Sequence, residues 1–412
     1  MKEIFEMARE FEKTIITEKA ERSVRAGHPW VFAEEIVSVS GGYENGDIVD
    51  IYSKKERYLG TGFINDNSKI RIRILSRNAN DRFDDEFFRR RIRYAIDYRR
   101  TVIGEERCFR VIFGEADSFP GLTVDKFEDV LVIQVLSLGF ERIKARLFDL
   151  FIEVFAEYGV KIRAICERND VSIRAKEGLE EGKGFVSDAR LDPDFDGKLV
   201  ITENGIKYEI DVLNGQKTGY FLDQKLNRLA AAGIAKGRRV LDCFTHTGAF
   251  ALNCAKAGAA HVTAVDISAD AIEKTRKNAE LNGLENGMSF LCADVFDLLT
   301  EMENAKKCDY DYIILDPPAF TKSRETVKAA INGYKAINAK AMKLLPRGGY
   351  LSTCSCSHFM TDELFRRMLA EAAEAAGVQL RQIEARRQAG DHPILWGVPE
   401  TDYLKFYIFQ VV

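Results

Sequence analysis

Two cysteines one residue apart, Cys354 and Cys356, have the clearest capacity for covalent chemistry in this sequence. They lie in "GGYLSTCSCSHFM", where an apolar run gives way to serine and histidine. A thiolate is a nucleophile and a metal ligand, whereas a buried thiol behaves as a small apolar group. The pair alone leaves four interpretations open: a metal clip, half of a disulfide, core packing or a nucleophile.

The remaining cysteines and histidines favour neither a metal nor a disulfide. Eight cysteines are scattered along the chain without a Cys-x-x-Cys pair, and the five histidines fall in no metal-ligand spacing. Structural zinc needs four clustered ligands. The first residues, "MKEIFEMAREFEKTIITEKAERS", lack the apolar segment of a signal peptide, and no later run approaches membrane-spanning length. We expect reduced thiols, no metal, no membrane contact and a cytoplasmic location.

Acidic residues stand where apolar strands of the C-terminal half are expected to end. After about residue 198, strand-like and helix-like segments alternate, which predicts a parallel sheet covered on both faces. Ligands of such sheets bind at the carboxyl ends of the strands. The acids expected at this edge are Asp242, Asp266, Asp294 and Asp316.

The spacing of these acids favours a nucleoside without a triphosphate. Gly248 lets the backbone approach a ligand before a helix begins, and the sequence contains no Walker A motif. Asp266 suits two ribose hydroxyls, and Asp294 is placed to accept from an exocyclic amine. Each acid alone could be a loop cap, but three at successive strand ends favour a bound adenosine. Asp316 opens "DPPAF", in which two prolines fix a rigid turn.

The N-terminal half is expected to hold short strands and an arginine-rich helix. Strand-like segments with glycine-rich turns fill the first 80 residues, and Arg71 and Arg73 share one face of "SKIRIRIL". The helix in "DRFDDEFFRRRIRYAIDYRRTVIG" includes Arg90. For both elements, a solvated surface and contact with RNA phosphates stay open. We predict domains at residues 1–80, 81–195 and 196–412.

Composition excludes few classes of protein. The chain has 412 residues, 46% hydrophobic and 30% charged, with a net charge of −4. These values are typical of globular domains and argue against a wholly basic nucleic-acid coat protein.

Several separated motifs together resemble one family. The order of Asp242, Phe244, Gly248, Asp266, Asp294 and the Asp-Pro-Pro turn is similar to that of class I S-adenosylmethionine-dependent methyltransferases. With "AERSVRAGHPWVFAEEI", "DSFPGLTVDKF", "ERNDVSIRAKEGL", "GYFLDQKLNR", "SCSHFM" and "GDHPI", the chain resembles bacterial 23S rRNA (cytosine-5)-methyltransferases with an N-terminal PUA domain. The resemblance implies a β-barrel PUA domain, a middle α+β domain and an α/β Rossmann-like methyltransferase domain with a mostly parallel sheet.

The resemblance also implies roles for individual residues. The cofactor would be S-adenosylmethionine, with Asp266 at its ribose and Asp294 at its adenine. His246, where relatives often have tyrosine, would pack over it. The implied cofactor-binding residues are Tyr220, Phe221, Asp223, Gln224, Asp242, Phe244, Gly248, Asp266, Asp294 and Asp316.

Cytosine-5 methylation explains the need for a thiol. Carbon 5 becomes nucleophilic when a thiolate adds to carbon 6. The family match makes Cys356 the nucleophile and leaves Cys354 a buried packing residue, while Asp316 would stabilise the adduct at N3. The base that removes the carbon-5 proton is unassigned, with His358 and His392 as candidates. Further expected contacts with the substrate are Pro317, Pro318, Phe320, Arg71, Arg73 and Arg90.

We therefore expect methyl transfer to a cytosine of 23S rRNA, with a homodimer left open. One alternative is methylation of a guanine or adenine nitrogen, which needs no thiol. A second is a non-catalytic RNA-binding assembly factor, which the full set of strand-end acids argues against.

Overall fold

The computed structural model describes residues 11–321 and 323–412, which form two compact units. The first unit holds the described residues up to Gly197 together with Val212–Tyr220 and Pro393–Thr401. The second holds Lys198–Asp211, Phe221–His392 and Asp402–Val412. The chain therefore passes repeatedly from one unit to the other.

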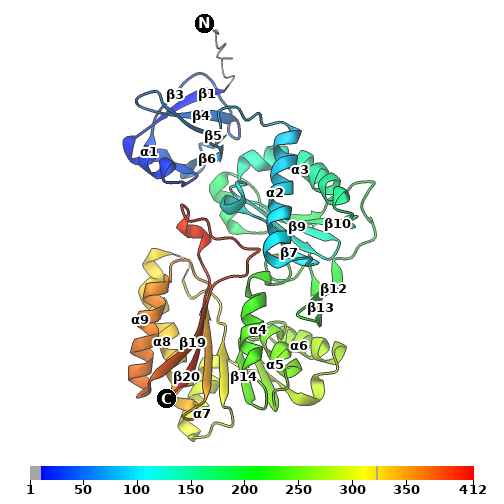
Figure 1. Ribbon diagram of the computed structural model, residues 1–412, viewed down its shortest axis with the longest axis vertical. Helices are drawn as coiled ribbons and strands as arrows, with labels where there is room; N and C mark the ends of the chain where they lie inside the picture. The colour runs from blue at the N-terminus through cyan, green and yellow to red at the C-terminus, as the bar shows by residue number, and fades with distance from the viewer. Residues whose placement is uncertain (1–10, 322) are drawn as a thin grey trace. The chain divides into compact units, whose positions relative to one another are not determined.

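The N-terminal part of the first unit, drawn in blue in Figure 1, is a six-stranded sheet in the order β2-β6-β5-β4-β1-β3. Its strands are β1 (Glu12–Ile16), β2 (Trp30–Phe32), β3 (Ile36–Val39), β4 (Ile48–Ser53), β5 (Tyr58–Ile64) and β6 (Ile70–Ser76). Helix α1 (Glu18–Arg25) begins after Thr17, whose hydroxyl accepts the N–H of Ala20. On β6, Ile72 and Ile74 are buried in the core of this sheet.

A five-stranded sheet in the order β11-β10-β9-β8-β7 forms the rest of the first unit with two long helices. The strands are β7 (Cys108–Phe113), β8 (Leu122–Phe127), β9 (Val130–Val135), β10 (Ala164–Arg168) and β11 (Lys183–Phe185). Helices α2 (Asp85–Ile103) and α3 (Leu138–Glu157) pack together. Asp84 caps α2, and Phe88, Ile92 and Ile96, which recur at helical spacing, are buried.

The second unit is built on a seven-stranded sheet in the order β16-β15-β14-β17-β18-β20-β19. The strands are β14 (Arg239–Cys243), β15 (His261–Asp266), β16 (Met288–Cys292), β17 (Tyr312–Leu315), β18 (Tyr350–Ser355), β19 (Leu380–Arg386) and β20 (Lys405–Val411). Strands β14 to β18 run parallel, and β20 runs antiparallel to both of its neighbours. A separate hairpin joins β12 (Lys198–Glu203) to β13 (Ile206–Asp211).

Helices cover both sides of this sheet, with α4, α5 and α6 on one side and α8 and α9 on the other (Figure 1). The helices are α4 (Lys225–Gly233), α5 (Ala249–Lys256), α6 (Ala269–Leu281), α7 (Val295–Ala305), α8 (Val327–Leu344) and α9 (Asp362–Ala376). Short 3₁₀ helices are η1 (Ala33–Glu35), η2 (Gly114–Asp117), η3 (Ser172–Glu177), η4 (Leu222–Gln224), η5 (Glu285–Gly287), η6 (Arg324–Thr326) and η7 (Pro399–Thr401). Since parallel strands need crossover connections, their carboxyl ends meet at one edge.

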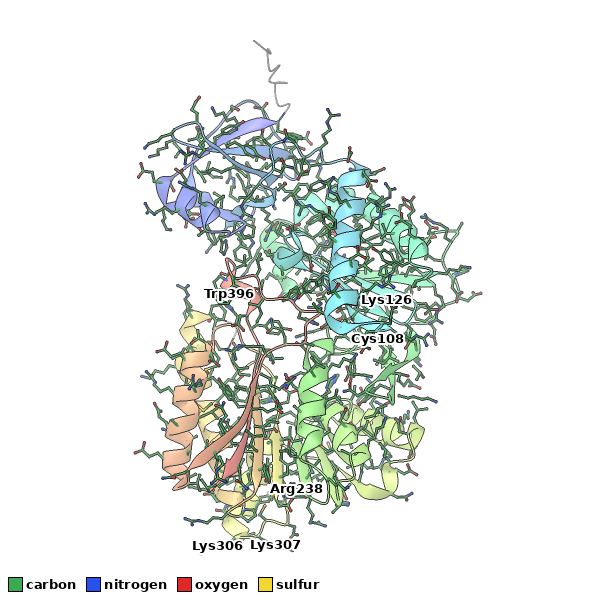
Figure 2. The ribbon with its side chains drawn as sticks, viewed as in Figure 1. Cys108, Lys126, Arg238, Lys306, Lys307 and Trp396 are labelled. Atoms are coloured by element: carbon green, nitrogen blue, oxygen red, sulfur yellow. The ribbon has the colours of Figure 1, made fainter. Side chains whose placement is uncertain are left out.

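Figure 2 labels basic residues at the opposite edge, where the parallel strands begin. Arg238 precedes β14, with its guanidinium 4.1 Å from the centre of the Tyr350 ring, and Lys306 and Lys307 precede β17. The same figure labels Trp396 of the first unit, whose side chain is 98% exposed.

The architecture confirms the expected fold class: a PUA-like β sheet, a middle α+β region and a mostly parallel Rossmann-like sheet. The boundaries after residues 80 and 195 stay a prediction. None of the helices in the described part of the chain combines the length and apolar character needed to cross a bilayer.

Candidate active site at the carboxyl edge of the sheet

The ends of β17 and β18 bring Asp316 next to Cys354. The two strands are paired in parallel with Leu315 opposite Thr353, so the residues that follow are neighbours. The thiol of Cys354 lies 2.9 Å from Oδ1 of Asp316 and 3.3 Å from the carbonyl oxygen of Leu315. Nε2 of Gln224 donates to the same Oδ1 at 3.2 Å. Cys354 therefore contacts Asp316 directly.

Burial sets the protonation of this cluster. Cys354 is fully buried, and burial with the nearby carboxyl of Asp316 raises the pKa of its thiol well above the ordinary value. Burial also raises the pKa of Asp316, although part of its residue surface stays accessible. A thiol that is kept protonated is a poor nucleophile. Cys354 is therefore a buried packing residue, as expected, with a polar contact that was not expected.

Cys356 follows the last residue of β18 and is half-buried. Both of its neighbours are anchored. The hydroxyl of Ser355 lies 3.0 Å from that of Tyr334, and the hydroxyl of Ser357 donates to the carbonyl oxygen of Thr321 at 2.8 Å. The backbone on either side of Cys356 is thus fixed, while the residue itself stays partly exposed.

Lys405, a residue that was not predicted to belong to the site, is buried beside this turn. It begins β20 opposite Ser355, and its Nζ donates to the carbonyl oxygens of Ser357 at 2.6 Å and Tyr403 at 2.8 Å. Burial lowers the pKa of Lys405 to about 8, while the charges of Asp402 and Cys356 act to raise it. The signal for it was a single lysine in the apolar run "YLKFYIFQVV".

The loop after β14 has an uncommon backbone. Phe244 and His246 adopt left-handed conformations with φ of 65° and 54°, which are strained for residues other than glycine. Gly248 has φ of 82°, and a Cβ there would lie 2.6 Å from Cγ2 of Thr275. Only glycine therefore fits this position at the start of α5.

Asp242 lies beneath this loop with one oxygen satisfied. Its Oδ2 accepts the hydroxyl of Thr245 at 2.6 Å and the N–H of Ala251 at 3.0 Å. Its Oδ1 and the hydroxyl of Thr247 are buried without a hydrogen-bond partner among the described residues. Burial raises the pKa of Asp242 to about 7, and nearby Asp316 contributes to the rise. Such orphaned acceptors fit a ligand that carries donors or positive charge.

His246 and Asp266 are connected through the backbone. The N–H of His246 donates to Oδ2 of Asp266 at 3.0 Å, and the N–H of Ser268 donates to Oδ1 at 3.0 Å. The imidazole lies 5.2 Å from the ring of Phe221, measured between centroids. Burial lowers the pKa of His246 to about 4, so its ring is neutral near pH 7 and packs rather than titrates.

Asp294 and Asp223 each accept a hydrogen bond from another residue of the protein. Asp294 caps α7, and its Oδ1 accepts the N–H of Phe296 at 2.7 Å. Asp223 is buried, and the hydroxyl of Tyr403 donates to its Oδ2 at 2.5 Å. Tyr220 is buried and belongs to the first unit. From the sequence, each strand-end acid could also be a cap, and the structure shows that Asp294 is one.

The two candidate histidines differ in their surroundings. Nδ1 of His358 is buried without a partner in the described chain, and the imidazole packs 5.4 Å from the ring of Phe359. His392 is only 2% exposed, with Nδ1 2.9 Å from Oδ1 of Asp391. His358 therefore has the freer ring nitrogen.

In the Asp-Pro-Pro turn, Pro317 is buried, Pro318 is exposed, and the ring of Phe320 lies 4.5 Å from that of Tyr334. Phe320 therefore packs on the same tyrosine that contacts Ser355.

The predicted RNA-contacting arginines lie in the first unit and have acidic partners. Arg71 pairs with Asp66 at 2.7 Å, and Arg90 with Asp81 at 3.2 Å. Arg73 pairs with Glu177 at 2.7 Å and is the least exposed of the three. Their contact with RNA stays a prediction.

Among residues 11–321 and 323–412, no three His, Cys, Asp or Glu side chains are grouped in a way that could hold a metal ion. In the same residues all eight cysteines are free thiols.

Two family models match the chain. Residues 15–77 match the PUA-like domain, and residues 191–393 match the S-adenosylmethionine-dependent methyltransferase family. Two solved structures of putative methyltransferases, one from Streptococcus mutans and one complexed with SAH, are 21% identical, with TM-scores of 0.80 and 0.81. Each likeness covers 97% of this chain and 100% of the other, and it supports the fold.

Closer relatives share the whole length. Ribosomal RNA large subunit methyltransferase I of Shewanella denitrificans is 41% identical over 95% of this chain and 97% of its own. The protein of the same name from Klebsiella pneumoniae is 37% identical over 98% and 99%. The orphaned acceptors at Asp242 and Thr247 fit the amino-acid part of S-adenosylmethionine. This chain belongs to the ribosomal RNA large subunit methyltransferase I family and is an S-adenosylmethionine-dependent methyltransferase.

Proposed function

We propose that the protein methylates carbon 5 of a cytosine in 23S rRNA through a covalent bond between Cys356 and carbon 6. The observation that carries the proposal is the pair of contrasting thiols at one sheet edge. Cys354 is buried against Asp316 with the pKa of its thiol raised, whereas Cys356 is partly exposed and lies between two anchored serines. The names of the relatives support large-subunit rRNA as the substrate.

The chemistry explains why an accessible thiol is required. The Cys356 thiolate forms a bond to carbon 6, and the electrons of the 5,6 double bond make carbon 5 nucleophilic. S-adenosylmethionine, when bound, would supply the electrophilic methyl group to carbon 5, and S-adenosylhomocysteine would be the leaving group. A base then removes the proton from carbon 5, the double bond re-forms and the Cys356 thiolate leaves.

Asp316 would stabilise the adduct at N3 of the cytosine. Its raised pKa favours the protonated carboxyl, which can donate a hydrogen bond or a proton to that nitrogen. Gln224 and Cys354 hold the carboxyl in place through Oδ1. This role differs from binding the cofactor, for which Asp316 was also predicted.

His358 is the better supported candidate for the base that removes the carbon-5 proton. It follows Cys356 by two residues, and its Nδ1 has no partner in the described chain. Nδ1 of His392 is held by Asp391. Replacing His358 with glutamine should let the covalent adduct accumulate.

Product analysis tests the proposal directly. The purified protein, S-adenosylmethionine carrying a labelled methyl group, and unmethylated 23S rRNA should give 5-methylcytidine after nuclease digestion and mass spectrometry. RNA containing 5-fluorocytosine should form a denaturation-resistant complex with the wild type and none with Cys356→Ala. A labelled guanine or adenine, produced equally well by Cys356→Ala, would overturn the proposal in favour of nitrogen methylation.

A further inference from the structure

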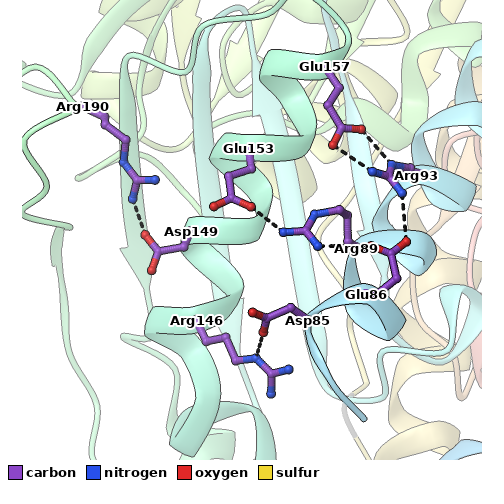
Figure 3. A network of polar contacts seen from close by, with 9 residues as sticks. All are labelled: Asp85, Glu86, Arg89, Arg93, Arg146, Asp149, Glu153, Glu157 and Arg190. Atoms are coloured by element: carbon purple, nitrogen blue, oxygen red, sulfur yellow. Dashed lines mark hydrogen bonds and ion pairs between the residues drawn. The ribbon is translucent and has the colours of Figure 1, made fainter. Parts of the chain in front are cut away.

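Helix α2 carries arginines of two kinds. Figure 3 shows that Arg89 and Arg93 on one face are paired with acids: Arg89 with Glu153 at 2.7 Å, and Arg93 with Glu157 at 2.8 Å. Glu86 pairs with both arginines as well. On this face, the protein itself neutralises the positive charge.

A second face of α2 borders an open pocket of about 660 Å³. Arg90, Arg91, Tyr94 and Tyr98 line it, and their spacing places them along one side of the helix. The pocket residues outside α2 are Asn78, Asp81, Ala116, Asp117 and Ser118. All of them belong to the first unit.

The guanidinium of Arg91 has no carboxylate in contact with it among the described residues. Its guanidinium lies 4.6 Å from the centre of the Phe87 ring, and in the described chain it makes no hydrogen bond or ion pair. Burial lowers the pKa of Arg91, with the charge of Asp81 opposing that shift. An arginine nonetheless stays charged near neutral pH, so this cation is partly desolvated without the close partner that offsets such a cost.

The acids that line the pocket have other partners. Asp117 accepts Nη2 of Arg99 at 2.8 Å and the N–H of Phe113 at 2.6 Å. Asp81 accepts the hydroxyl of Ser76 at 2.5 Å and pairs with Arg90 at 3.2 Å. The positive charge of Arg91 therefore remains for a ligand.

Two tyrosines give the pocket aromatic surface. Tyr94 is 63% exposed and Tyr98 is 39% exposed, one turn apart on the helix. Exposed rings beside arginines are the combination with which proteins bind single-stranded nucleic acid, through base stacking and phosphate contact. A double-stranded helix keeps its bases stacked inside and cannot use such rings.

We propose that this pocket binds an unpaired nucleotide of the RNA substrate, with Arg91 at a phosphate and Tyr94 stacked on a base. The inference rests on the proposed function only in taking RNA as the substrate. The proposed binding position is independent of the cytosine-5 reaction, which does not require it.

The test compares Arg91→Gln and Tyr94→Ala with Arg93→Gln, which removes the same charge from the paired face. Binding of a fluorescent single-stranded 12-nucleotide RNA is measured by anisotropy at several salt concentrations. Arg91→Gln should weaken binding about tenfold and reduce the salt slope by about 1. Tyr94→Ala should weaken it about fivefold or more with the salt slope unchanged. Arg93→Gln should stay within about twofold of the wild type.

Equal affinities of Arg91→Gln and Arg93→Gln would overturn the proposal. So would a normal affinity of Tyr94→Ala with full competition by inorganic phosphate, since the pocket would then be a simple anion site. Thermal unfolding checks that each variant is folded. Cys356→Ala should bind the 12-mer normally, so loss of the cytosine-5 proposal and loss of the pocket proposal give different results.

Discussion

The two halves of the carboxyl edge hold their acids in different ways. On the side of β15 and β16, Asp266 and Asp294 accept hydrogen bonds from backbone N–H groups. On the side of β17 and β18, Asp316 is contacted by the side chains of Gln224 and Cys354. Backbone donors are fixed by the fold, so the first half is suited to binding. Side-chain donors are set by residue type, so the second half can be tuned for reaction.

The largest expected effect separates the two thiols. Cys356→Ala should lower methyl transfer by at least about a thousandfold, because the covalent route is lost. Cys354→Ala should cost about 1 kcal/mol of stability from the cavity and less than about tenfold in rate. Single-turnover transfer of labelled methyl groups measures the rates, and denaturant unfolding measures the stability.

Calorimetry of S-adenosylmethionine binding is the control for both variants. Each should bind the cofactor as the wild type does, because neither thiol lies on the side of β14 to β16. A greater loss of rate in Cys354→Ala than in Cys356→Ala would assign the nucleophile to Cys354 and reverse the comparison.

Replacing Lys405 should change the reactivity of the Cys356 thiol without changing the side of β15 and β16. Lys405→Met removes a nearby positive charge and the hydrogen bond to the carbonyl oxygen of Ser357, so the thiolate form of Cys356 should be less favoured. Alkylation by iodoacetamide, followed across pH by mass spectrometry of the Cys356 peptide, should be roughly tenfold slower near pH 7.

Lys405→Arg keeps the charge and serves as the matched variant. It should recover most of the alkylation rate. An unchanged pH profile in Lys405→Met would limit Lys405 to a structural role in β20.

Asp266 should affect binding and not the reaction. Asp266→Asn replaces one of the two carboxylate oxygens with an NH2 group, so either the N–H of His246 or that of Ser268 loses its acceptor. The Kd for S-adenosylmethionine should rise about tenfold, or 1.4 kcal/mol. Methyl transfer at saturating cofactor should change by less than about threefold. Asp270→Asn, at an exposed position in the first turn of α6, is the control. A normal Kd with a low maximal rate would contradict the division between the halves.

The smallest expected effect is on stability. The pKa of Asp242 in the folded protein is about 7, above its ordinary value of 3.8, so the folded state binds more protons than the unfolded state between these values. This contribution to stability is fully present below about pH 4 and is lost as the pH rises toward 7. His246, with its pKa lowered to about 4, acts in the opposite direction between about pH 4 and 6.5.

Subtracting the free energy of unfolding of the wild type from that of an Asp242 variant isolates the contribution of Asp242 from that of His246. Without cofactor, the free energy of unfolding of Asp242→Asn, relative to the wild type, should improve as the pH rises from 4 to 7. Urea unfolding at each pH measures this, and a constant difference would show that Asp242 titrates normally.

The sequence predicted what depends on local pattern. Strand ends and the Asp-Pro-Pro turn can be predicted from apolar runs that end at turn-forming residues. On this basis the sequence predicted Asp242, Asp266, Asp294 and Asp316 at one edge of the sheet. The observed sheet has them there. The contact of Cys354 with Asp316 depends on strand register, and the position of Lys405 depends on an antiparallel strand 48 residues downstream of Ser357. The pairing of Arg89 and Arg93 depends on acids 64 residues away. Contacts with residues so distant in the sequence cannot be predicted from the local spacing of residues.

The repeated passage of the chain between the two units limits how the protein can be cut. The segment Val212–Tyr220 lies within the methyltransferase match but belongs to the first unit. There, the carbonyl oxygen of Val212 accepts Nη1 of Arg168 at 2.9 Å, and the buried hydroxyl of Thr218 donates to Asp125 at 2.6 Å. A fragment beginning at residue 196 would lack Arg168 and Asp125. Catalytic fragments and domain chimaeras of this protein should therefore keep the middle region, because a single breakpoint does not separate two self-sufficient folding modules.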